Sequence, residues 1–364
     1  MPEHDPIPSS TLAPHGAAQG SIQGSIQGSI RGSGQPGPTA RPAGLPPFDI
    51  QVEPPDLRAW RAGNTGIEGY ITLRSGRPGP HVAVTALTHG NELGGAIVLD
   101  RLLRAGFMPT RGWLTLGFNN LAAFDRFDPR QPTASRFVEE DFNRIWDPVV
   151  LDGPRQSAEL SRAREIRPLI ETVDVLLDLH SMLWPSVPLM LSGEAARGRE
   201  LAFGIGVPEL VVADAGHASG RRLIDHPRFT DAASRAAAVL VEAGQHWQLV
   251  TVDLMLASMA GLLRHLDMAG DAACLPPLPP RRQRFAEVTT VVTACTGSFA
   301  FVEPYRGGDV VPVAGTVIAH DGERPIKTPH DACLLVMPSL RPSRGHTAVR
   351  LARFAPEPCQ NEPR

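Results

Sequence analysis

Apolar positions over residues 48–273 alternate between runs of strand length and runs of helix length. Residues 82–87 form a short apolar, partly β-branched run, as a buried strand does. Residues 93–103 follow it and predict a helix. Strands that alternate with helices predict an α/β fold with a mostly parallel sheet. Further strands are predicted at 48–52, 69–73, 113–118, 173–179, 209–212 and 238–242, further helices at 157–173 and 247–266, and a helical turn at 121–127.

Two segments of this region have a less regular pattern. Residues 231–240 are rich in Ala and could form a helix, whereas the apolar run 238–242 is typical of a buried strand. Residues 125–142 are polar and interrupted by Pro, so a long loop is predicted there.

The pattern changes twice along the chain. Residues 1–46 repeat Gly, Ser, Gln and Pro and cannot bury enough apolar surface to fold, so we predict a disordered leader, with a docking tail as the alternative. The Pro-rich segment 274–284 predicts a linker between a hydrolase domain at 47–273 and the remainder. A small all-β domain at 285–340 and a tail at 341–364 complete the predicted organisation, the β-type runs being 287–294, 297–302, 310–313, 316–319 and 332–337.

Composition narrows the function classes. The chain has 364 residues, 42% of them apolar, and a net charge of −3, so no nucleic-acid partner is indicated. No apolar run reaches the roughly 18 residues that a membrane span needs, and the first residues, MPEHDPIPSS, do not form a secretory signal. The four cysteines are widely spaced, which predicts reduced thiols in a cytoplasmic protein.

Candidate metal ligands follow two of the predicted strands. His89 and Glu92 lie three residues apart where the strand 82–87 ends, and Gly90 between them permits a tight turn. Such a pair is weak evidence alone, but in α/β sheets sites form at the carboxyl ends of strands. His180 ends another strand, where it is either a third ligand or a core histidine, and Asp178 could orient its ring. Three ligands and an open position are typical of a hydrolytic zinc site.

Candidate catalytic and binding groups lie elsewhere in the chain. Glu242 ends the apolar strand 238–242, so partial desolvation would raise its pKa towards that of a general base. Arg136, Asn143 and Arg144 flank the end of the long polar loop. They are either ordinary loop residues or a recognition set for a carboxylate and an oxyanion.

The motifs H-G-N-E, D-F-N-R, D-L-H-S and V-E-A-G, in this order, resemble the succinylglutamate desuccinylase/aspartoacylase family of zinc-dependent deacylases. The resemblance implies a zinc-carboxypeptidase-like α/β fold, with a mixed, mostly parallel sheet flanked by helices and a small C-terminal all-β domain over the active-site mouth. It also implies one Zn²⁺ ion bound by His89, Glu92 and His180, Glu242 as general base, Arg136 at the scissile carbonyl, and Asn143 and Arg144 at the substrate's carboxylate.

The chain departs from the family pattern at positions that bear on specificity. Gln245-His246 stands where many members have Gly-Pro after the V-E-x-G motif. Aspartate-type specificity uses a further arginine upstream of the base, for which Arg228 and Arg235 are the nearby candidates. The acyl group and the amine of the substrate therefore stay open.

The sequence-based hypothesis is a zinc-dependent amidohydrolase that deacylates a small N-acyl amino acid or related carboxylate. One alternative is a zinc carboxypeptidase acting on peptides or cell-wall fragments, because it would share the metal site. A less favoured alternative is a non-catalytic binding module on the same fold. No G-x-S-x-G nucleophile elbow and no P-loop occurs. Homo-oligomerisation is left open.

Overall fold

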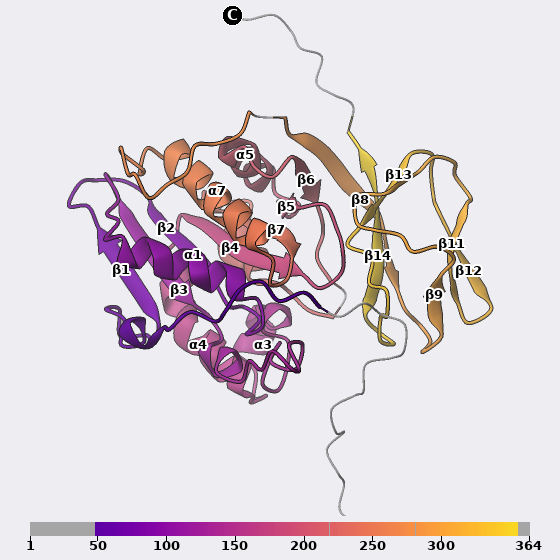
Figure 1. Cartoon of the computed structure of the whole chain (residues 1–364), viewed down its shortest axis with the longest axis horizontal. Coiled ribbons are helices and arrows are strands. Elements are labelled where there is room, and N and C mark those ends of the chain that lie inside the picture. The colour runs from indigo at the N-terminus through magenta and orange to yellow at the C-terminus, as the bar shows by residue number, and fades with distance from the viewer. Residues whose placement is uncertain (1–47, 218, 281, 356–364) are drawn as a thin grey trace, which may run out of the picture. The chain divides into compact units, whose positions relative to one another are not determined.

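The computed structural model describes residues 48–217, 219–280 and 282–355, and the predicted leader at 1–46 lies outside them (Figure 1). The described residues form a mixed α/β sheet of eleven strands with flanking helices, and a second sheet of three strands. The order in the large sheet is β1-β3-β2-β4-β7-β5-β6-β8-β14-β13-β10.

The centre of the large sheet is parallel. β3, β2, β4 and β7 run in one direction, and β1 pairs antiparallel with β3 at the edge. β5 runs antiparallel to β7 and parallel to β6. The bounds are β1 (Tyr70–Arg74), β2 (His81–Ala86), β3 (Trp113–Phe118), β4 (Val175–Met182), β5 (Leu189–Leu191), β6 (Leu210–Ala213) and β7 (Ala237–Gln245).

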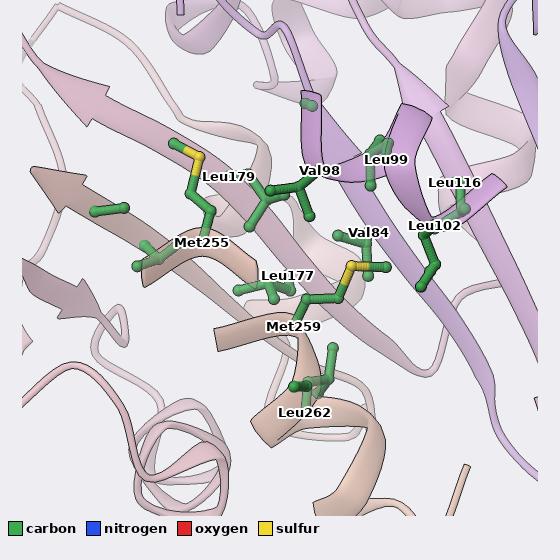
Figure 2. Packing of buried hydrophobic residues seen from close by; sticks show 14 of the residues in the cluster. Val84, Val98, Leu99, Leu102, Leu116, Leu177, Leu179, Met255, Met259 and Leu262 are labelled. Atoms are coloured by element: carbon green, nitrogen blue, oxygen red, sulfur yellow. The ribbon is translucent and has the colours of Figure 1, made fainter. Parts of the chain in front are cut away.

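Both faces of the central sheet are buried. Successive residues of a strand point to opposite faces, and on β4 Leu176 and Leu177 accordingly belong to different core clusters. On one face, Leu177 packs with Met259 and Val98, which come from two different helices (Figure 2). The helices of this face are α1 (Leu93–Arg104), α5 (Ala196–Ile205) and α7 (Leu249–His265), and the opposite face is covered by α3 (Pro148–Leu151) and α4 (Ala158–Ile170).

Short helical turns complete the α/β part. They are α2 (Leu121–Phe124), α6 (Pro227–Thr230) and the 3₁₀ turns Arg58–Trp60, Phe142–Arg144 and Leu223–Asp225. No helix among the described residues is long and apolar enough to cross a bilayer.

The C-terminal part is all β, as predicted. β8 (Arg284–Thr293) pairs with β6 and carries the large sheet onward to β14, β13 and β10. The second sheet consists of β9, β11 and β12, and a separate apolar cluster fills the region between the two sheets. The bounds are β9 (Phe299–Phe301), β10 (Val310–Val311), β11 (Val317–Asp321), β12 (Arg324–Lys327), β13 (Cys333–Val336) and β14 (Thr347–Phe354).

Two sequence-based expectations are corrected by the structure. Residues 48–52 are not a strand, because Gln51 bonds to the Trp247 carbonyl and no ladder follows. Of the two alternatives for residues 231–240, the strand at 238–242 is confirmed as part of β7, and the segment contains no helix. The predicted tail 341–364 contains β14, which pairs with two strands. The remaining domain boundaries stay predictions, since one sheet runs through both parts.

Candidate active site

The predicted site residues meet at the carboxyl ends of the central parallel strands. His89 follows β2, while His180 and Glu242 lie on β4 and β7. His180 and Glu242 are paired in the β4–β7 register, so their side chains share one face of the sheet. The apolar residues that precede His180 and Glu242 place both strands in the core, and the two site residues are themselves buried.

His89, Glu92 and His180 form a buried donor group. One ligand atom from each lies within 4.8 Å of the others. Glu92 joins the two rings, with Oε1 2.7 Å from His89 Nδ1 and Oε2 3.0 Å from His180 Nδ1. Burial alone would raise the pKa of Glu92, but the neighbouring His89 and His180 hold it well below its ordinary value. Two imidazoles and an ionised carboxylate are a donor set that suits zinc and leaves a coordination position open.

The carboxylate of Asp178 orients the ring of His180. Its Nε2 lies 2.7 Å from Asp178 Oδ2, so Nδ1 is the nitrogen turned towards Glu92. Asp178 accepts further hydrogen bonds from Thr85 at 2.7 Å and Thr88 at 3.1 Å. Such an outer carboxylate fixes the tautomer and raises the basicity of a ligand histidine. The contact expected between Asp178 and His180 is therefore present.

The turn that carries His89 and Glu92 requires a glycine. A Cβ on Gly90 would lie 2.4 Å from the backbone of Ala123 and Phe124. We expect Gly90→Ala to lower the free energy of unfolding by about 1–3 kcal/mol or more, since rigid backbone must shift. Gly297→Ala is the control, because no atom lies within 4 Å of its Cβ position and its φ is not positive. Equal stability of the two variants in denaturant titrations would contradict this role.

Glu242 is a buried carboxyl group in the same cavity as the donor group. It is 7% exposed, and its Oε2 has no hydrogen-bond partner among the described residues. Burial raises the pKa of Glu242 to about 8. A carboxylate so placed readily accepts a proton from a neighbouring group, which is what a general base must do.

Arg136 lies beside the donor group. Its NH2 lies 2.8 Å from His89 Nε2 and donates to Asp141 Oδ2 at 3.1 Å, while NH1 lies 3.6 Å from Glu92 Oε1. The Arg136 carbonyl accepts a hydrogen bond from Gly90, which ties this loop to the ligand turn. The Arg136 guanidinium therefore lies next to any group that binds at His89, Glu92 and His180.

Asn143 and Arg144 lie in the 3₁₀ turn after Asp141. The Asn143 side-chain oxygen accepts a hydrogen bond from the Leu223 amide at 2.8 Å, which fixes the turn. Arg144 NH1 donates to the Asn143 carbonyl at 2.6 Å, but the nearest carboxylate oxygen, on Asp141, is 4.0 Å away. Burial lowers the pKa of Arg144 to about 10. Arg144 is thus a largely buried cation with no close carboxylate among the described residues.

All seven predicted site residues line one cavity of about 550 Å³. The cavity wall also includes residues of β14 and of the segment between β13 and β14, so the C-terminal β part helps to enclose it. His89, Glu92 and His180 lie in this wall together with apolar side chains. The apolar residues of the wall are Phe137, Met182, Leu183, Trp184, Leu191, Leu240, Met337, Pro338 and Pro342.

Sequence reasoning missed three arginines of this wall, Arg222, Arg341 and Arg350. Arg222 and Arg350 are buried and share Asp214 Oδ2, at 2.9 Å and 2.8 Å. Arg222 also pairs with Asp225 at 2.7 Å, so two carboxylates balance these two cations. Arg350 NH2 lies 2.7 Å from Nε2 of His217, whose pKa is lowered by burial and then by the arginine charges. An arginine inside the apolar run of β14 was the signal that could have revealed Arg350.

The arginines considered for aspartate-type specificity do not reach the cavity. Arg228 donates to the Val173 carbonyl at 2.8 Å and pairs with Asp174, at the opposite end of β4. Arg235 is exposed and is absent from the cavity wall. Besides Arg136 and Arg144, the arginines that do line the cavity are Arg222, Arg341 and Arg350.

A family model, that of the succinylglutamate desuccinylase/aspartoacylase catalytic domain, matches residues 78–267, more than half of the chain. No curated protein sequence matches.

Solved structures share the fold of this chain. Succinylglutamate desuccinylase from Vibrio cholerae is 18% identical with a TM-score of 0.60, over 79% of this chain and 86% of that one. The enzyme of the same name from Chromobacterium violaceum is 19% identical with a TM-score of 0.56, over 80% and 90%. The ectoine utilization protein EutE (DoeB) from Ruegeria pomeroyi is 15% identical with a TM-score of 0.55, over 78% and 88%. At these identities, the likeness establishes the fold.

Proposed function

The chain belongs to the succinylglutamate desuccinylase/aspartoacylase family of deacylases, and from this premise we propose that it is a zinc-dependent hydrolase of an amide bond in a small N-acyl amino acid or related carboxylate. The observation that carries the proposal is the placement of Glu242. An unpartnered buried carboxyl group lies opposite His180 in the β4–β7 register, in the same cavity as the donor group His89, Glu92 and His180.

The donor set defines the chemistry that a metal would supply. A zinc ion held by His89, Glu92 and His180 would lower the pKa of an adjacent water to about 7 and polarise the substrate carbonyl. The carboxylate of Glu242 takes a proton from the attacking water as the water oxygen bonds to the amide carbon, and it gives that proton to the amine nitrogen as the C–N bond breaks. Arg136 donates to the carbonyl oxygen as negative charge develops there.

The surroundings of Arg144 favour a substrate that carries a negative charge. Its guanidinium lies in the cavity wall with no carboxylate closer than 4.0 Å among the described residues, and Asn143 precedes it on the same turn. A substrate carboxylate would supply the missing charge in bidentate geometry. The cavity of about 550 Å³, enclosed in part by the C-terminal β part, suits a small molecule better than a long peptide.

We expect Arg144→Met to raise KM for an N-acyl amino acid by about 10–100-fold with a small change in kcat. A hydrogen bond to a charged group contributes roughly 1.5–3 kcal/mol, and about 1.4 kcal/mol corresponds to tenfold in binding. Steady-state kinetics measures the effect. The matched control is the same substrate with its carboxylate converted to an amide, which parent and variant should bind equally. A fall in kcat at unchanged KM would assign Arg144 a different role.

A hydrolysis screen tests the proposed function. The zinc-loaded protein is assayed on N-acetyl, N-succinyl and longer N-acyl amino acids and on peptides, before and after chelation and with zinc restored. We expect release of a free amino group from one N-acyl class, lost with chelation and regained with zinc. Peptide cleavage without deacylation would favour the carboxypeptidase alternative. A protein that binds no zinc and cleaves none of these compounds would favour a binding module.

A further inference from the structure

The chain after Glu242 turns back towards the donor group through a β-bulge. β4 and β7 are in register up to the pair His180–Glu242, and the next pair is Met182 with Gln245, so β7 has one extra residue. Beyond the bulge, the His246 amide donates to the Met182 carbonyl at 2.8 Å. The ring of His246 is thereby placed against the end of β4.

His246 and Ser181 form a buried pair that the proposed chemistry does not use. Ser181 Oγ lies 2.7 Å from His246 Nδ1, and both residues are at most 5% exposed. The backbone amide of Ser181 donates to Glu92 Oε2 at 3.1 Å, the oxygen that faces His180. The contact with His246 therefore restrains Ser181, whose backbone amide donates a hydrogen bond to the Glu92 carboxylate.

Trp247 contacts the same ligand turn from the next position. Its Nε1 donates to the carbonyl of Asn91 at 2.8 Å, between the two ligands of the H-G-N-E turn. Trp247 is buried and has a φ of 65°, a left-handed conformation that is strained for a bulky residue. Strain of this kind persists only where surrounding contacts impose it. Here the contacts include the indole hydrogen bond and ring packing against His246, with centroids 5.1 Å apart.

We propose that Ser181, His246 and Trp247 form a clamp, named here the ligand-turn clamp, that holds the His89–Glu92 turn in ligand geometry and sets the affinity of the metal site. The clamp rests on the proposed metal-dependent function. Its members are positioning residues: each acts on the turn or on the Glu92 carboxylate. Outer contacts of this kind typically change metal affinity by about 10–100-fold when removed.

The test is zinc affinity of the full chain, measured by competition with a chromophoric chelator after metal removal. Ser181→Ala removes the hydroxyl bonded to His246, and Trp247→Phe keeps a ring but removes the N–H. We expect each variant to bind zinc about 10–100-fold more weakly than the parent. Thr289→Val is the matched control, since it removes another hydroxyl–imidazole contact, 2.9 Å to His330 Nε2, in the C-terminal β part, and leaves zinc affinity unchanged.

Melting temperatures with and without zinc separate positioning from a general loss of stability. A clamp variant should lose part of the rise in Tm that zinc produces, whereas the control variant should show the parental rise. If the parent binds zinc and both clamp variants bind it as tightly, the clamp is wrong and the proposed function stands. If the parent itself binds no zinc, both are wrong. Should Ser181→Ala fail to fold, Trp247→Phe decides the question.

Discussion

Glu242→Gln is expected to bind zinc as the parent does and to lose turnover by roughly 10²–10⁴-fold, the range that a general base contributes. Glutamine matches the size of glutamate but cannot take up the proton. The substitution breaks no hydrogen bond at Oε2, which has no partner among the described residues. Measuring kcat and zinc content on the same preparation tests both halves of this expectation.

The matched control for Glu242→Gln is Glu159→Gln. Glu159 is also buried, but its carboxylate accepts hydrogen bonds from backbone amides of the loop before Asp141 and lies outside the cavity wall. That variant should affect stability more than the chemical step. A Glu242→Gln protein with parental turnover would remove Glu242 from the proposed mechanism, and one without zinc would show that Glu242 also supports the metal site.

The central strands were predictable because burial on both faces leaves a continuous apolar run. This is the pattern of β2 and β7, and in β4 only Asp178 interrupts it. His89, His180 and Glu242 stand at or shortly after the ends of these runs. The segment 48–52 instead alternates between apolar and polar residues, but this pattern alone does not make a strand, because a strand also needs a partner to pair with. The short β5 and the helix α5 were missed since Gly, Pro and Arg interrupt their apolar positions.

The sequence could predict those site residues that lie at the ends of strands. The motif residues converge because parallel neighbours end at the same edge of the sheet. Arg350 could not be placed in this way, since its partner Asp214 is 136 residues away and belongs to another part of the fold. The supposed tail is a strand because its backbone pairs with β8 and β13, and Asp214 neutralises the buried Arg350 within it.

Replacing Arg136 should mainly change kcat and replacing Arg144 should mainly change KM, although both arginines line the same cavity. Arg136 lies beside the donor group, whereas Arg144 has Asp141 as its nearest carboxylate and lies near Arg222 and Arg350. A group that acts where charge develops stabilises the transition state more than the bound substrate. The two positions therefore predict different kinetic outcomes.

We expect Arg136→Ala to lower kcat by roughly 10²–10³-fold, as the loss of one oxyanion donor typically does. The backbone contact from Gly90 to the Arg136 carbonyl survives the substitution, so the ligand turn keeps that support. Zinc content is measured alongside kcat, because Arg136 also lies near Glu92 and His89. Arg144→Met is the matched control, with its effect expected in KM. Altered substrate affinity at normal turnover in Arg136→Ala would show that Arg136 binds the ground state and that the oxyanion is stabilised elsewhere.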